Sequence, residues 1–181
     1  GAWGRDGAKM QGRNGEVTRE GVERKRQKKD MVQGSDDRLR KFEPIKVTVD
    51  GREFTVEQAE KRDYEAALAI FRKGDFDAAQ AAFIEFLKRY PQSGYSPSSF
   101  FWLGNAQYAT RDYKEAMQNF RILLSQAPDH MRAPEAVLSI ANCQVELKDI
   151  RAARKTLEEL VKAYPQSEAA AAAKERLARL K

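Results

Sequence analysis

Few residues of this chain have the chemistry of a catalytic or metal site. Its 181 residues include one histidine, His130, and one cysteine, Cys143. A zinc site needs several ligands at short spacing, and neither residue has further ligands beside it. The sequence also lacks a glycine-rich phosphate loop and a nucleophile elbow. We therefore predict no enzyme activity, no cofactor and no metal, with His130 in a solvated loop and Cys143 a small buried thiol.

The other group with binding chemistry is the basic run from Arg24 to Lys29, which could contact phosphates or an anionic surface. No aromatic residues lie between its charges to stack on bases, so a solvated charge run is the stronger interpretation. A nucleic-acid-binding module that uses residues 19–41 is a weaker alternative. We expect neither nucleic acid binding nor membrane insertion, because no apolar stretch reaches the roughly 20 residues that span a bilayer.

The basic run belongs to an N-terminal segment, residues 1–44, whose composition differs from that of the remaining chain. Residues 1–41 carry 12 Lys and Arg against 7 Asp and Glu, which is +5 of the net charge of +6. Seven of the eleven glycines precede residue 35, and apolar residues are few there. A faint heptad pattern that includes Met10 and Val17 has arginines at intervening core positions. We expect a flexible tail or a degenerate coiled coil, with any homotrimer formed through it being weak.

The rest of the chain is built from repeats. The turn Gly-Asp-Phe at 74–76 recurs as Arg-Asp-Tyr at 111–113 and Lys-Asp-Ile at 148–150, so the period is 37 residues. A proline follows each copy, at Pro91, Pro128 and Pro165. A fixed period of about 20 to 50 residues is typical of stacked supersecondary units. Function is therefore to be sought on the surface that the stack creates.

Each repeat has the apolar spacing of two helices. Small residues occur at equivalent positions of both helices, where two helices of a pair must cross closely. These positions are Ala67, Gly104 and Ala141 on the first helices and Ala79, Ala116 and Ala153 on the second. We predict first helices at 56–73, 97–110 and 134–147, second helices at 76–90, 113–126 and 150–164, and a final capping helix from 167 to 181.

This combination resembles the tetratricopeptide (TPR) family, whose unit has 34 residues. The three extra residues lie in the connections between repeats, around 94–96 and 130–132. The resemblance implies an all-α fold, a TPR solenoid of three helix-turn-helix repeats plus a C-terminal capping helix. Its expected domain is 58–181, with repeats at about 60–93, 97–130 and 134–167 and a cap at 168–181.

Several local signals set the expected element boundaries. Residues 45–57 form a linker that alternates around Asp50-Gly51, which predicts a β-hairpin. An isolated hairpin is marginally stable, so it must dock on another element. Thr55 and Gln58 resemble a capping box at the start of the first helix. We expect the N-caps of the second helices to be Asp75, Asp112 and Asp149.

The expected binding surface is the concave face of the stack, lined by the first helix of each pair. Aromatic and aliphatic groups there would supply desolvated area for a partner segment, and two asparagines at matched positions could bond its backbone amides. A chaperone-type carboxylate clamp is not expected, because the positions that need basic residues hold Tyr64, Phe101 and Leu138. The candidate groove residues are Tyr64, Leu68, Phe71, Phe101, Asn105, Tyr108, Leu138, Asn142 and Val145.

A narrower resemblance rests on particular phrases of the sequence. Ser-Phe-Phe-Trp-Leu-Gly-Asn-Ala-Gln-Tyr at 99–108, the repeated Tyr-Pro-Gln-Ser at 90–93 and 164–167, and the alanine-rich end resemble the C-terminal TPR domain of the Tol-Pal-associated family YbgF, also called CpoB. The resemblance covers residues 60–181. It implies a periplasmic scaffold of a Gram-negative bacterium that binds TolA, with a peptidoglycan synthase complex as a further partner, and that helps to coordinate peptidoglycan synthesis with outer-membrane constriction during cell division.

One alternative keeps the same architecture and changes the function. TPR components of outer-membrane protein assembly have similar repeats. Those lipoproteins have an N-terminal lipidated cysteine and more repeats, and neither feature is visible in this sequence. No signal peptide is visible either, so the expected periplasmic location rests on the family resemblance.

Overall fold

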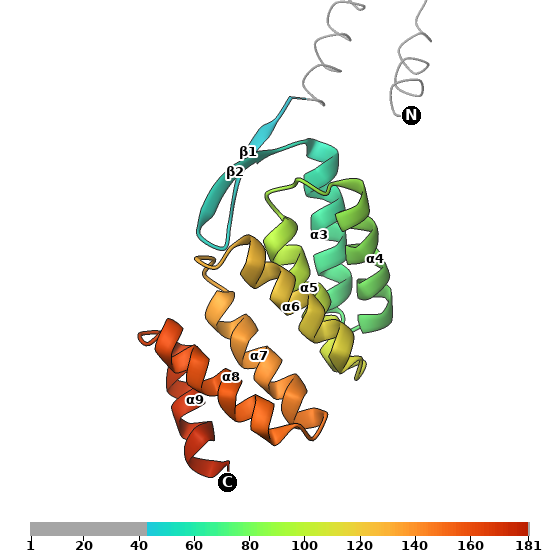
Figure 1. Ribbon diagram of the computed structural model, residues 1–181. Helices are drawn as coiled ribbons and strands as arrows, with labels where there is room; N and C mark the ends of the chain where they lie inside the picture. The colour runs from blue at the N-terminus through green and yellow to red at the C-terminus, as the bar shows by residue number, and fades with distance from the viewer. Residues whose placement is uncertain (1–42, 181) are drawn as a thin grey trace, which may run out of the picture. The chain divides into compact units, whose positions relative to one another are not determined.

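The computed structural model describes residues 43–180, and in them a short β-hairpin precedes a stack of seven helices (Figure 1). The predicted tail and its weak coiled coil lie outside the described residues. The elements, in order, are β1 Ile45–Val49, β2 Arg52–Val56, α3 Gln58–Arg72, α4 Phe76–Arg89, α5 Ser96–Ala109, α6 Tyr113–Gln126, α7 Ala133–Glu146, α8 Ile150–Ala163 and α9 Glu168–Arg179.

The helices form three antiparallel pairs and a cap, and their ends lie within two residues of the predicted ones. The turn inside each pair needs a left-handed residue at the same repeat position, namely Gly74 (φ 84°), Arg111 (φ 67°) and Lys148 (φ 68°). Glycine adopts this conformation without a steric cost, whereas the two other residues adopt it against their preference. At Arg111 and Lys148, the packing of the stack therefore holds a turn conformation that the local sequence does not favour.

The helix caps follow the prediction in part. The Asp75 carboxylate accepts a hydrogen bond from Ala78 N at 3.2 Å, and Asp149 caps α8 in the same way. Asp112 instead accepts a bond from the Thr110 hydroxyl at 2.9 Å, so it does not cap α6 with its side chain.

The capping box predicted at Thr55 and Gln58 is wrong. The box is formed by Glu57 and Glu60, and Glu57 N donates to Glu60 Oε1 at 3.1 Å. Thr55 cannot cap α3 because it still belongs to the extended β2. The strand therefore shifts the helix start by two residues.

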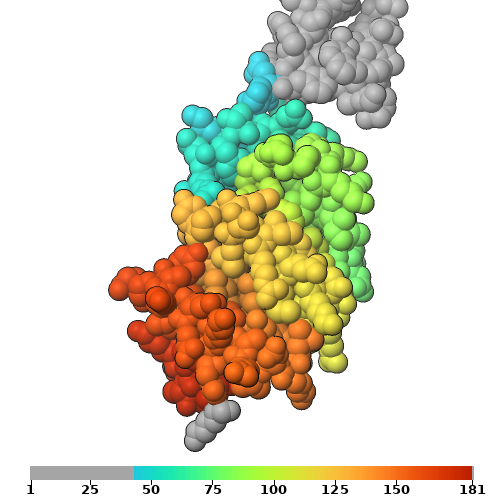
Figure 2. Space-filling view, in the orientation of Figure 1, coloured from blue at the N-terminus to red at the C-terminus, as the bar shows by residue number. Residues whose placement is uncertain are grey.

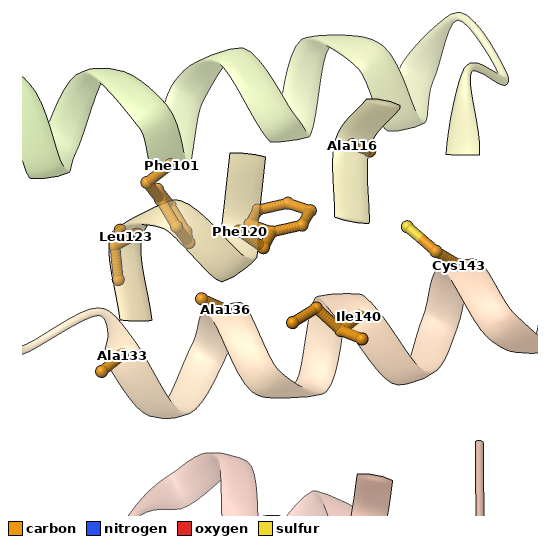
Figure 3. Close-up of a cluster of buried hydrophobic side chains, with 8 residues drawn as sticks. All are labelled: Phe101, Ala116, Phe120, Leu123, Ala133, Ala136, Ile140 and Cys143. Carbon is orange, nitrogen blue, oxygen red and sulfur yellow. The ribbon is translucent and has the colours of Figure 1, made fainter. Parts of the chain in front are cut away.

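The core runs along the stack as clusters between successive helices. Figure 3 shows one of them, in which the Phe120 ring of α6 lies between α5 and α7. Its neighbours include Phe101 of α5, Ile140 of α7 and the buried thiol of Cys143, as predicted for that cysteine. A second cluster joins α7, α8 and α9, where Leu177 and Leu180 cover Leu157 and Leu160. The last helix thereby closes the apolar end of the stack.

The helix crossings depend on the small residues. Ala79, Ala116 and Ala153 are all 0% exposed, so each is fully enclosed by its neighbours. At Gly104, a Cβ atom would lie 2.8 Å from two carbons of the Phe120 ring, closer than van der Waals contact allows. The α5–α6 pair therefore packs at a separation that only glycine permits at this position.

The hairpin docks on the two connections that are longer than in the TPR family. Its two-residue loop has positive φ at both Asp50 (51°) and Gly51 (74°), as a type I′ turn requires. From β2, the Phe54 ring meets the Tyr95 ring edge-on at 5.1 Å. A Cβ atom at Gly94 would overlap the Phe54 ring, so the close approach needs glycine there. Figure 2 shows the hairpin atoms lying against the surface of the helices.

None of the helices among residues 43–180 combines the length and apolar content needed to cross a membrane.

The glycine at the α5–α6 crossing gives a first prediction. Gly104→Leu should lower the free energy of unfolding by about 1 to 3 kcal/mol, because the added side chain overlaps Phe120. Ala109→Leu, which adds the same side chain at an exposed site of the same helix, should change it by less than about 0.5 kcal/mol. Urea unfolding measures both. Leucine favours a helix over glycine, so equal midpoints for the two variants would contradict the packing argument.

Candidate functional site

Two of the nine predicted groove residues are buried between repeats. Tyr64 is 3% exposed and Phe101 is 2% exposed. The Tyr64 ring stacks on the Tyr95 ring at 4.1 Å, and its hydroxyl accepts a hydrogen bond from Trp102 Nε1 at 3.2 Å. The Phe101 ring lies 5.0 Å from the guanidinium carbon of Arg132. Both rings therefore join repeats, and little of either is presented to a partner in this structure.

The other seven predicted residues are half-buried. Phe71 lies between the rings of Phe76 and Trp102, at centroid distances of 5.2 and 5.1 Å. Tyr108 contacts the Tyr113 ring edge-on at 5.3 Å. These side chains keep part of their surface accessible while neighbours hold them in place. The half-buried set is Leu68, Phe71, Asn105, Tyr108, Leu138, Asn142 and Val145.

The two asparagines each use one end of their amide inside the molecule. Asn105 Nδ2 donates to the Phe101 carbonyl at 2.8 Å, which leaves its side-chain oxygen as an acceptor. Asn142 Oδ1 accepts a hydrogen bond from Arg176 of α9, which leaves its side-chain nitrogen as a donor. One acceptor and one donor, 37 residues apart and on equivalent turns of α5 and α7, match the two polar groups of a peptide unit.

A buried polar cluster lies where the hairpin loop meets the helices. The Asp50 carboxylate accepts hydrogen bonds from the Ser98 hydroxyl at 2.5 Å and from Arg132 Nε at 2.9 Å. His130 Nε2 is 3.7 Å from the same carboxylate, and the His130 and Asp50 side chains are 2% and 8% exposed. His130 Nδ1 accepts from Arg132 N at 3.1 Å.

The expectation that His130 is solvated is wrong, and the hairpin is the reason. The connection that carries His130, between α6 and α7, would be open to water in a helix stack without the hairpin. In this structure the hairpin loop covers it. Burial lowers the pKa of His130 below its ordinary value of 6.5, more than the Asp50 charge raises it. The buried imidazole is therefore held in its neutral form.

Burial also shifts the pKa values of other groups near the core. It raises the pKa of Tyr64 and that of Tyr95 to about 12, and that of the Cys143 thiol to about 11. A thiol with a raised pKa and no exposure is a poor nucleophile. Among residues 43–180 there is also no group of three or more His, Cys, Asp or Glu side chains that could hold a metal ion.

A pocket of about 590 Å³ lies between the hairpin and the first repeat. Two predicted groove residues, Tyr64 and Leu68, line it. Sequence analysis missed the rest of its lining, which comes from β1 and Asp50, from the charged side chains of α3, and from Tyr95, Trp102 and Arg132. The sequence did indicate that β1 could line a pocket, because a hairpin that must dock will border the surface on which it docks. Nothing local to Arg132 indicated that it would reach this pocket.

Comparisons with known proteins agree with this architecture. The structure of PcrH from Pseudomonas aeruginosa matches with a TM-score of 0.57 over 69% of this chain and 93% of that one, at 19% sequence identity. The TPR domain of Arabidopsis OM64 matches with a TM-score of 0.56, covering 67% and 96% of the two chains, at 16% identity. The fold thus defines a TPR-type helical-repeat protein.

A family model matches most of the chain. Residues 56–181 match the family described as YfiO, outer membrane lipoprotein, and the chain belongs to that family. Within this range lie the helices α3 to α9 together with the last residue of β2.

Curated relatives share a shorter segment. The cell division coordinator CpoB of Pseudomonas putida is 42% identical over 53 residues, which are 29% of this chain and 20% of the relative. CpoB of Escherichia coli is 45% identical over 47 residues, 25% of this chain and 18% of the relative. These matches confirm the resemblance to the CpoB TPR domain, and the matched segment spans about a fifth of each relative.

The buried cluster predicts that the charge of Asp50 stabilises the docked hairpin. Asp50→Asn should lower the free energy of unfolding by about 1 to 3 kcal/mol, because hydrogen bonds to a charged group are lost or weakened. Asparagine tolerates positive φ as aspartate does, so the loop itself is preserved. Glu53→Gln is the matched control, because Glu53 is 3.9 Å from Lys46 with both side chains exposed. An equal effect of both substitutions in urea unfolding would contradict the role of the cluster.

A third prediction concerns pH. Because the folded pKa of His130 is lowered, the unfolded chain binds the proton first as the pH falls below about 6.5. Stability should therefore be greatest above this pH and fall between pH 7 and 5. His130→Asn keeps an acceptor for Arg132 N and removes the titration. Urea unfolding at several pH values should show a shallower loss for this variant, and identical slopes would contradict the prediction.

Proposed function

We propose that this protein is a non-enzymatic scaffold of the bacterial cell envelope, located in the periplasm, whose concave face binds a segment of a partner protein. The observation that carries the proposal is the pair Asn105 and Asn142. One retains an acceptor and the other a donor at equivalent positions of the first helices, with half-buried apolar side chains beside them. Such a surface suits a peptide or helix with an accessible backbone or polar side chain.

Solved structures of similar fold support peptide binding as the mode of action. PcrH matches with a TM-score of 0.58 in a complex with the chaperone binding region of PopD. The TPR2B domain of yeast Sti1, in its pHsp70 complex, matches with a TM-score of 0.57. Both structures are similar to this chain in fold alone. The binding chemistry proposed here rests on its own side chains.

The leading partner is TolA of the Tol-Pal system. The CpoB relatives carry the name cell division coordinator, and they share a segment of about 50 residues with this chain. By binding TolA, the scaffold would help to coordinate peptidoglycan synthesis, through a synthase complex, with outer-membrane constriction during division. A homotrimer formed through the N-terminal segment is a further part of this hypothesis.

The second candidate is a role in outer-membrane protein assembly. The match of residues 56–181 to the YfiO family favours it. The two functions use the same groove but different partners, so a binding measurement separates them. The shared prediction is that Asn105 and Asn142 contribute to the partner contact.

Calorimetric titration of TolA fragments into the full chain tests the first candidate. The double variant Asn105→Ala, Asn142→Asp should bind more weakly by about 1 to 3 kcal/mol, the range for hydrogen bonds lost at a buried polar contact. Asn142→Asp keeps an oxygen for Arg176 and removes the donor, so the cap contact is preserved.

Asn119→Ala is the matched control, because the Asn119 amide lies on α6 and bonds Gln107 inside the molecule. It should leave affinity for TolA unchanged. Equal binding by wild type and the double variant, with both folded, would place the site elsewhere. Failure of any TolA fragment to bind, together with binding of an outer-membrane assembly component, would favour the second candidate.

A further inference from the structure

We propose that the pocket between β1 and α3 binds an extended, acidic segment of a partner protein as a third strand of the hairpin. This inference rests on the proposed scaffold function and assigns a second contact, separate from the asparagine pair. Its evidence is the open edge of β1, the helix face opposite, and the charges that line the space between them.

The edge of β1 is exposed to the pocket. The described sheet has only two strands, and the five consecutive residues from Lys46 to Asp50 all line the pocket. Side chains of a strand alternate between faces, so a wall made from one face would contain every second residue. An uninterrupted run indicates that the main chain at the strand edge borders the pocket.

The hairpin geometry decides which main-chain groups point into it. In a hairpin with a two-residue loop, the residues that flank the loop form a hydrogen-bonded pair, and pairing then alternates along the strands. Val49 forms such a hydrogen-bonded pair with Arg52, and Val47 forms one with Phe54. The N–H and C=O groups of Lys46 and Thr48 therefore point away from β2, as an added strand requires.

The opposite wall is one face of α3. It is formed by Lys61, Glu65, Leu68 and Arg72, spaced by three to four residues. From the first to the last is a rise of about 16 Å, at about 1.5 Å per residue. The five residues of β1 extend over about 16 Å as well, at about 3.3 Å per residue. Both walls suit an extended segment of about five residues.

The floor of the pocket offers apolar contact. Trp102 is half-buried and lines the pocket together with Tyr95. The Trp102 ring is fixed by the Arg132 guanidinium, whose carbon is 4.8 Å from the ring centroid, and by its hydrogen bond to Tyr64. A rigid aromatic surface of this kind can accept one or two apolar side chains of the segment at low entropic cost.

The charges of the lining select an acidic occupant. Lys46, Lys61, Arg72 and Arg132 outnumber the acidic pair of Asp50 and Glu65. Asp50 is already bonded to Ser98 and Arg132. Within residues 43–180 no carboxylate partner is found for Arg72, whereas Lys46 and Lys61 have only long, exposed pairs at 3.9 Å.

The same charge argument disfavours the chain's own N-terminal segment as the occupant. Residues 1–41 carry 12 Lys and Arg against 7 Asp and Glu, so their net charge has the sign of the lining. The occupant favoured by charge is therefore a segment of another protein that alternates acidic with apolar residues.

Fluorescence polarisation of a labelled seven-residue peptide that alternates glutamate with valine, added to the full chain, tests the proposal. The counterpart with lysine in place of glutamate should bind much more weakly. Thr48→Pro removes an outward N–H from the β1 edge, and it should weaken binding of the glutamate peptide about tenfold. Thr55→Pro makes the same change at the other edge of the hairpin and should leave binding unchanged. Arg72→Gln should weaken binding about threefold, and Arg62→Gln, which lies outside the pocket, should not.

Several outcomes would overturn the proposal. One is no binding of the glutamate peptide, and another is binding that Thr48→Pro and Arg72→Gln leave unchanged, which would place the peptide on the basic N-terminal segment. Preference for the lysine peptide would point to that segment itself as the occupant. Circular dichroism confirms that each variant is folded. Because the TolA titration uses the Asn105 and Asn142 variants, loss of one contact with the other intact shows which of the two proposals fails.

Discussion

The close approach of the two helices in each repeat is the constraint on which the rest of the structure depends. Gly104 leaves space for the Phe120 ring, and the alanine at the equivalent position of each second helix is fully buried. A larger side chain at any of these positions would hold the pair apart, because protein interiors are close-packed. Once the pairs close, their outer apolar faces have no partner except the next pair, and the stack follows.

The longer connections give this stack a feature beyond the generic repeat. Tyr95 in the first and His130 and Arg132 in the second form the surface on which the hairpin docks. A two-stranded sheet is too small to be stable alone, so the hairpin needs these contacts. In turn it buries a histidine and an aspartate and forms one wall of the pocket over the first repeat. Stability of the hairpin and shape of this pocket are therefore linked.

The aromatic and amide side chains of the predicted groove have different roles in the structure. Tyr64 and Phe101, which the sequence suggested as contacts for a partner, hold neighbouring repeats together instead. The amides of Asn105 and Asn142 satisfy half of their hydrogen-bonding capacity internally and keep the other half available. The internal bonds fix the direction of the remaining groups. In the function proposed above, a partner would not have to order them, which would reduce the entropic cost of binding.

The sequence by itself determined the repeat, the helix pairs, the crossing residues and the hairpin, because these depend on apolar period, turn chemistry and side-chain size within about 40 residues of chain. The sequence did not determine which ring side chains would be buried by other segments of the chain. Tyr64 and His130 are buried by Tyr95 and by the Asp50 loop, the latter separated from His130 by 80 positions. Burial, pKa and the pocket arise from contacts between such distant segments, and only the tertiary structure brings those segments together.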